Sequence, residues 1–222
     1  MKMKLNLLTV GAAIALTASY SNAGTLAASN LAALAGDTLI AINDVPVPVG
    51  SAVAQAGYFN VGFDVDAAAA AGDYTELIAN FNALGTGVIG NTAGLLGANV
   101  AGLYDVNADY GNSAGQPFEG ALLYTFIGNK LDLASSTGYA LINSGETADP
   151  DGATPDSNLM PLLGGTYLIG TVGGGTTADL SPILGAGNEN VAMGTFNLVV
   201  VPEPSALLLG LVGFVGLLRR RR

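Results

Sequence analysis

Three oxygen-bearing side chains alternate along one short segment, with the spacing of a calcium loop. Asp105, Asn107 and Asp109 stand at every second position, and a glycine follows them. Alternate carboxylate and amide oxygens at the start of an EF-hand loop converge on one Ca²⁺ ion. Tyr110 and Gln116 depart from that pattern, where a glycine and a glutamate are expected. We expect these residues to form an Asx-rich turn and to bind no cofactor. The alternative is that the three side chains bind calcium.

Two pairs of carboxylates are the other candidates for chemistry. Asp64 lies two residues before Asp66, and Glu119 is followed further along by Asp132. Two facing carboxylates serve as the acid and the base of a glycoside hydrolase. An acidic chain of this size offers such pairs by chance, so neither pair identifies an enzyme by itself.

The residue types that the chain lacks exclude several classes of catalysis. The chain has no histidine and no cysteine. Their absence excludes Ser-His-Asp hydrolysis, Cys-His hydrolysis and most zinc catalysis. Gly85, Gly87 and Gly90 match a dinucleotide-binding fingerprint, but a predicted helix precedes them where that motif needs a strand. We therefore expect no catalytic residues and a protein that is not an enzyme.

The acidic charge lies between the two ends of the chain. The whole sequence carries a net charge of −10, but six of its seven basic residues lie in the first four or last four positions. Residues 24–201 hold one cation, Lys130, against 16 carboxylates, which gives this part a net charge of −15. Such a body repels polyanions, so we expect no nucleic-acid partner. Cations and uncharged polysaccharide stay open as partners, and the charge also favours solubility.

The N-terminus has the three parts of a secretory signal peptide. Lys2 and Lys4 precede an apolar run over residues 5–18, and small residues lead up to Ala23. The run is too short and wrongly flanked for a membrane-spanning helix. We expect export through the inner membrane and cleavage between Ala23 and Gly24.

The C-terminus combines a helix-breaking acidic motif, an apolar segment and a basic end. The motif is Pro202, Glu203 and Pro204. The apolar segment, residues 206–218, is followed at once by Arg219, Arg220, Arg221 and Arg222. Its 13 residues form about 20 Å of helix, which is short for a hydrocarbon core about 30 Å thick. We expect a stop-transfer signal that holds the arginines in the cytoplasm, with a lasting C-terminal anchor as the alternative.

The order of these three parts resembles the PEP-CTERM sorting signal of bacteria that make extracellular polysaccharide. The resemblance covers about the last 22 residues. It implies an exosortase-like membrane enzyme as a partner, which would cut near Pro202, Glu203 and Pro204 while the chain is held at the inner membrane. It also implies delivery to the cell envelope, the outer surface or the extracellular matrix.

The exported body carries no motif that names an activity. We expect a structural or adhesive role in a polysaccharide matrix or biofilm, with exopolysaccharide as a partner. A calcium-stabilised carbohydrate-binding module is the alternative, and a carboxylate-dependent glycosidase is a third possibility.

The fold expected for the body is mainly β. We divide the chain into a signal peptide (1–23), an acidic β-rich domain (24–200) and the sorting signal (201–222), and expect a β-sandwich-like domain with one short helix. Strands are predicted over 38–42, 58–65 and 118–127, the last of them buried on both faces. The helix is predicted from an Asp73 cap to Gly85, with Leu77, Ile78, Phe81 and Leu84 on its apolar face.

Overall fold

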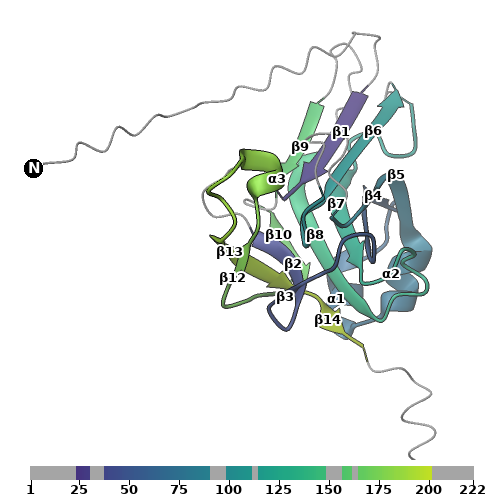
Figure 1. The fold of residues 1–222 in the computed structure, drawn as a ribbon. Coiled ribbons are helices and arrows are strands. Elements are labelled where there is room, and N and C mark those ends of the chain that lie inside the picture. The colour runs from purple at the N-terminus through teal and green to yellow at the C-terminus, as the bar shows by residue number, and fades with distance from the viewer. Residues whose placement is uncertain are drawn as a thin grey trace, which may run out of the picture.

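The computed structural model describes residues 24–30, 38–90, 99–111, 115–148, 157–161 and 165–201. Within these ranges the chain is mainly β, as predicted, and its strands form three sheets that are not closed (Figure 1). The sequence predicts one helix, whereas the described residues form three short ones.

The largest sheet has six strands and is antiparallel throughout. Its main path runs β10-β8-β7-β4-β5, and β14 pairs with β8 beyond the end of β10. Its strands are β4 (Val53–Phe59), β5 (Phe81–Val88), β7 (Leu122–Gly128), β8 (Gly138–Thr147), β10 (Thr166–Ile169) and β14 (Val199–Val200).

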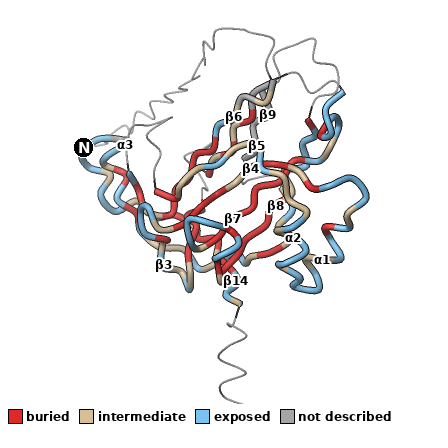
Figure 2. Tube along the Cα trace, turned by 90° about the vertical axis from the view of Figure 1, so that its right-hand side faces the viewer, coloured by how far each residue is buried: buried red, intermediate tan, exposed pale blue. Residues whose placement is uncertain are grey.

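Strand β7 begins at Leu122, four residues after the predicted start at Phe118, and it is buried on both faces as the sequence predicts. Leu123 and Ile127 point into one hydrophobic cluster, which also contains residues of the two other sheets. Tyr124 and Phe126 point into a second cluster on the opposite face, which the helices cover. Figure 2 shows the buried chain concentrated along β7 and β8. Each large apolar side chain buried in this way stabilises the fold by about 1.5–3 kcal/mol.

The two smaller sheets bring together segments that lie far apart in the sequence. One has the order β6-β1-β9, and the other has the order β11-β13-β2-β3 with β12 also paired to β13. The pairs β1–β9 and β2–β13 are parallel. Their strands are β1 (Gly24–Ser29), β2 (Thr38–Ile42), β3 (Val45–Pro46), β6 (Asp105–Gly111), β9 (Ser157–Pro161), β11 (Thr171–Val172), β12 (Thr176–Ala178) and β13 (Val191–Asn197).

Two glycines let β5 of the large sheet lie directly against β6 of the three-stranded sheet. A Cβ atom on Gly85 would stand 2.8 Å from the Cβ atom of Ala108 and 2.9 Å from Cγ1 of Val106. A Cβ atom on Gly87 would collide with the main-chain carbonyl of Asp105. These glycines therefore serve close packing within a strand, which agrees with the rejection of a nucleotide-binding turn.

Aspartate side chains begin the two longer helices, α1 (Val65–Ala71) and α2 (Tyr74–Asn80), while α3 (Ser181–Leu184) is a single turn. Asp73 accepts a hydrogen bond from the Glu76 N–H at 3.2 Å, so the predicted cap is confirmed. The predicted extension to Gly85 is wrong, because the chain enters β5 at Phe81. There Phe81 packs edge-on against Phe126 of the large sheet, and this packing outweighs the helical spacing.

Among the predicted strands, 38–42 is confirmed as β2, and 58–65 is wrong. Strand β4 ends at Phe59. Gly62 then adopts a left-handed φ of 83°, and the Asp64 side chain accepts a hydrogen bond from the Ala67 N–H at 2.9 Å. A turn and a helix cap therefore occupy residues whose apolar alternation is typical of a strand.

Asn30 fixes the end of β1 inside the protein. Its side-chain nitrogen donates to the carbonyls of Thr38 and Gly102 at 2.9 and 2.8 Å, and its oxygen accepts from the Tyr104 N–H at 2.8 Å. The side chain is only 1% exposed. One buried side chain thus makes hydrogen bonds to three main-chain groups, at Thr38, Gly102 and Tyr104.

We expect Asn30→Ala to lower the free energy of unfolding by about 3 kcal/mol, about 1 kcal/mol for each lost hydrogen bond. Urea denaturation followed by circular dichroism measures this change. Asn60→Ala is the control, because the Asn60 side chain makes its hydrogen bonds on the exposed surface. Equal losses in the two variants would contradict a special role for Asn30.

Candidate functional site

The three predicted calcium ligands lie in strand β6 and not in a loop or turn. Val106 is fully buried on the core side of this strand, whereas Asn107 is exposed. The Asn107 amide donates to the Asp105 carboxylate at 2.9 Å. Alternate positions of a strand are about 6.5–7 Å apart and lie in a row. The strand therefore accounts for the spacing of Asp105, Asn107 and Asp109, and calcium binding by them stays a prediction.

The predicted processing residues lie at or beyond the edges of the described chain. Gly24 is the first residue of β1 and pairs with Gly111 of β6. Ala23, the motif Pro202–Glu203–Pro204 and the arginines 219–222 lie outside the described residues. Within the described ranges, no helix is both long enough and apolar enough to cross a membrane. The apolar segment 206–218 lies beyond those ranges.

Three of the four carboxylates considered for hydrolysis cap local backbone. Asp64 caps α1, as described above. Glu119 accepts from the Gly115 N–H at 2.6 Å, and Asp132 accepts from the Ala134 N–H at 3.3 Å. These contacts are typical of turns and helix ends. The fourth carboxylate, Asp66, lies in a pocket.

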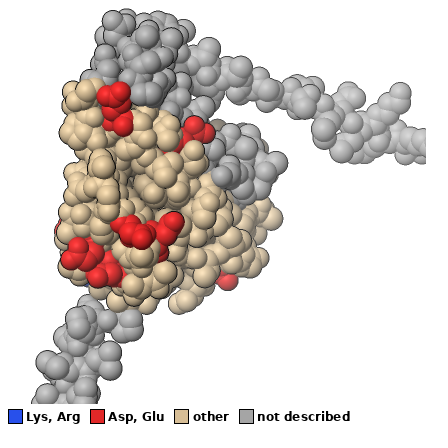
Figure 3. Space-filling model, turned by 180° about the vertical axis from the view of Figure 1, so that it is seen from behind, with Lys and Arg blue, Asp and Glu red and all other residues tan. Residues whose placement is uncertain are grey.

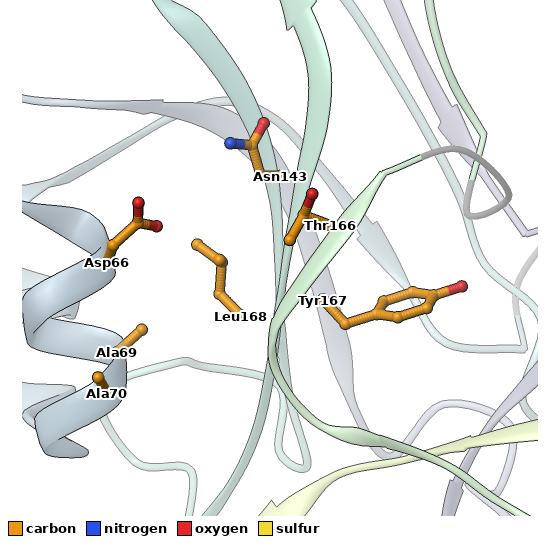
Figure 4. Close-up of a pocket in the computed structure, with 7 residues that line it drawn as sticks. All are labelled: Asp66, Ala69, Ala70, Asn143, Thr166, Tyr167 and Leu168. Carbon is orange, nitrogen blue, oxygen red and sulfur yellow. The ribbon is translucent and has the colours of Figure 1, made fainter.

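A surface pocket of about 360 Å³ lies between helix α1 and strands β8 and β10 (Figure 4). We call it the Asp66 pocket. It is lined by Asp66, Ala69, Ala70, Asn143, Thr166, Tyr167 and Leu168. The helix supplies the carboxylate and two small side chains, and the strands supply an amide, a hydroxyl and an apolar side chain.

The polar heads of the Asp66 pocket lie beside an apolar centre (Figure 4). Figure 4 shows Leu168 reaching toward the helix, with the Asp66 carboxylate and the Asn143 amide beyond its tip. The Tyr167 ring points away from the pocket and packs on Phe196, with ring centroids 4.6 Å apart. The pocket therefore offers hydrogen-bonding groups around aliphatic carbon, without an aromatic platform.

A bulge in β8 holds Asn143 at the rim of the pocket. Leu122 of β7 pairs with Thr147, but Tyr124 pairs with Asn143, so β8 carries extra residues between these positions. Gly145, in this bulge, has a left-handed φ of 76° and donates its N–H to the Asn143 side-chain oxygen at 2.9 Å. Bulges commonly re-aim side chains beside binding sites. This one fixes the amide oxygen of Asn143 and leaves its nitrogen on the side of Asp66 (Figure 4).

The charge of Asp66 affects a tyrosine in the neighbouring hydrophobic core. Burial, and after it the negative charge of Asp66, raise the pKa of the Tyr124 hydroxyl. Tyr124 therefore stays neutral at physiological pH, and Asp66 is the charged group of the pocket.

A second polar cluster joins the turn between β2 and β3 to strand β13. Asp44 has a left-handed φ of 62°, and its carboxylate accepts from the Thr195 hydroxyl and from the Asn197 amide, the latter at 2.8 Å. In return, the Asn197 oxygen accepts from the Asp44 N–H at 2.8 Å. Hydrogen bonds from Thr195 and then Asn197 hold the pKa of the Asp44 carboxyl below its ordinary value of 3.8. This cluster of Asp44, Thr195 and Asn197, which we call the Asp44 clasp, holds together segments about 150 residues apart in the sequence.

No protein-family model, curated protein or solved structure matches this chain.

Asp66 is one of the carboxylates that the sequence offers for hydrolysis, but neither cluster can be recognised as a site from the sequence. Asp44 lies in an Asn-Asp turn between two apolar runs, which signals a hairpin but not its partner on β13. The Asp66 pocket draws residues from 66–70, 143 and 166–168, and no short motif spans them.

We expect Asp44→Asn to melt at a lower temperature than the native protein at pH 7. Asparagine keeps the size of the side chain and tolerates the left-handed backbone, so the change removes mainly the charge. Because folding lowers this pKa, the difference should be full above pH 3.8 and vanish as the pH falls through the lowered folded value. Thermal melts from pH 7 down to about pH 2 test this. A difference that does not change with pH would contradict the role of the charge.

Gly173 and Gly174 offer a matched pair for testing the clasp. A Cβ atom on Gly173 would collide with the interacting atoms of Asp44, Thr195 and Asn197, whereas one on Gly174 would lie 3.8 Å from the Asp44 carboxylate. We expect Gly173→Ala to lower the free energy of unfolding by about 2 kcal/mol, and Gly174→Ala to leave it nearly unchanged. Urea denaturation of both variants measures this. Equal effects would show that the clasp tolerates the added methyl group.

Proposed function

We propose that this chain is an exported protein, processed at both ends and delivered to the cell surface or extracellular matrix. Its N-terminus would be cleaved between Ala23 and Gly24. Its C-terminus would be held at the inner membrane by the 206–218 segment and the arginines. An exosortase-like enzyme would then act near Pro202, Glu203 and Pro204.

One observation carries this proposal: within the described residues, strand pairing reaches the residues next to both predicted processing sites. β1 begins at Gly24, where its backbone pairs with β6. At the other end, β14 pairs with β8, and the Val201 N–H donates to the Thr137 carbonyl at 2.6 Å. The body between the sites therefore uses the residues up to each boundary in its own sheets, which supports their assignment as domain edges.

The surface and composition of the body support a structural or adhesive role. On the face in Figure 3, acidic side chains form separate groups, and no lysine or arginine of the described chain is visible. Such a surface keeps copies of the protein apart and soluble in a crowded matrix. We propose that the three sheets make a β-sandwich-like body whose part in the matrix is binding or spacing and not catalysis.

We expect replacement of all four arginines, 219–222, by glutamine to impair retention at the inner membrane before processing. Cations that directly follow an apolar segment stop its transfer across the membrane. Membrane fractionation and intact-mass analysis of protein from its native host measure the effect. The native protein should yield a mass that starts at Gly24 and ends near Pro202 to Pro204.

Lys130→Gln is the control for this experiment. It removes the one cation of the body and should change neither retention nor the mature mass. Normal retention and processing without the arginines would refute the sorting part of the proposal.

A further inference from the structure

We infer that the Asp66 pocket binds a neutral saccharide unit of the polymer that surrounds the protein. This inference rests on the proposed function, because it names the partner of a matrix protein. Its basis is the chemistry of the pocket: a carboxylate, an amide and a hydroxyl around an aliphatic centre.

The polar groups of the Asp66 pocket complement sugar hydroxyls. Asp66 can accept two hydrogen bonds, the Asn143 nitrogen can donate, and the Thr166 hydroxyl can do either. A sugar presents donors and acceptors on neighbouring carbons, and it satisfies such a mixed set better than a purely anionic or apolar ligand. A hydrogen bond to an ionised carboxylate is also among the stronger ones.

The apolar part of the pocket suits the C–H face of a sugar ring. Leu168 forms the centre, and Ala69 and Ala70 form the helix wall. A volume of about 360 Å³ lies at the small end of the range for ligand sites, which suits a small unit of a chain. The pocket is at the surface, so a polymer can pass across it.

The negative charge of the body and of the pocket favours neutral polymers over anionic ones as ligands. The body carries a net charge of −15, and Asp66 is the only charged group among the described residues that line the pocket. An anionic polysaccharide would meet repulsion over the whole body and at the site itself. We therefore expect neutral glycans to bind and anionic ones to be rejected.

Small side chains on α1 keep the pocket open, and this provides a matched pair of variants. Ala70→Leu places a larger side chain in the pocket. Ala67→Leu makes the same change on an exposed residue of the same helix, outside the pocket. Leucine and alanine are both good helix formers, so both variants should fold. Asp66→Asn removes the charge of the pocket at constant size.

The experiment is affinity electrophoresis of the protein recovered from its host, with mild detergent if the tail is retained. Gels contain dextran, laminarin or pullulan as neutral polymers, or alginate as an anionic polymer. We expect retardation by at least one neutral polymer and none by alginate. Ala70→Leu and Asp66→Asn should each weaken that binding about tenfold, and Ala67→Leu should not change it.

Three outcomes would overturn the inference. They are no retardation by any neutral polymer, equal retardation of Ala70→Leu and Ala67→Leu, and retardation by alginate as strong as that by the neutral polymers. Sorting is tested separately by intact mass, and the pocket variants should be processed normally. Loss of sugar binding with normal processing would therefore refute this inference alone, whereas abnormal processing of the native chain would refute the proposed function.

Discussion

The need to bury both faces of strand β7 organises the rest of this structure. A strand with Leu123 and Ile127 on one face and Tyr124 and Phe126 on the other requires a covering layer on each side. The two smaller sheets supply one layer, and helices α1 and α2 supply the other. Without disulfides, the stability of the fold depends on these two cores and on the hydrogen bonds at their edges. The Asp66 pocket lies where the helical layer meets the rim of the sheet.

Local signals in the sequence predicted some elements well. Strand β2 matches its predicted bounds, and the Asp73 cap begins α2 as expected, because both depend on neighbouring residues. The end of α2 could not be predicted in the same way. Phe81 has helical spacing in the sequence, yet it packs with aromatic rings of β4 and β7, which come from elsewhere in the chain. Tertiary packing of this kind overrides local preference.

The alternation of Asp105, Asn107 and Asp109 shows a second limit of sequence reasoning. A spacing of two residues is typical of metal ligands in a loop and also of one face of a strand. The pattern alone does not distinguish a loop from a strand, whereas the pairing of β1 with β6 shows that these residues lie in a strand; calcium binding by them stays a prediction. The Asp44 clasp and the Asp66 pocket could not be predicted from the sequence for a related reason. Their residues meet only after parallel and antiparallel pairings have joined distant segments.

If the proposed sorting of the tail is correct, the short strand β14 also limits the length of chain between the folded body and the membrane. Five steps separate Val201, the last described residue, from Ala206, where the apolar segment begins. Fully extended, they span at most about 17 Å. If that segment enters the bilayer at Ala206, the folded body stands almost on the membrane before release. The three-stranded sheet, at the opposite end from β14 (Figures 1 and 2), then points away from that membrane. Under the proposed sorting mechanism, the processing enzyme would therefore cut the chain in a narrow gap between the membrane and the folded domain.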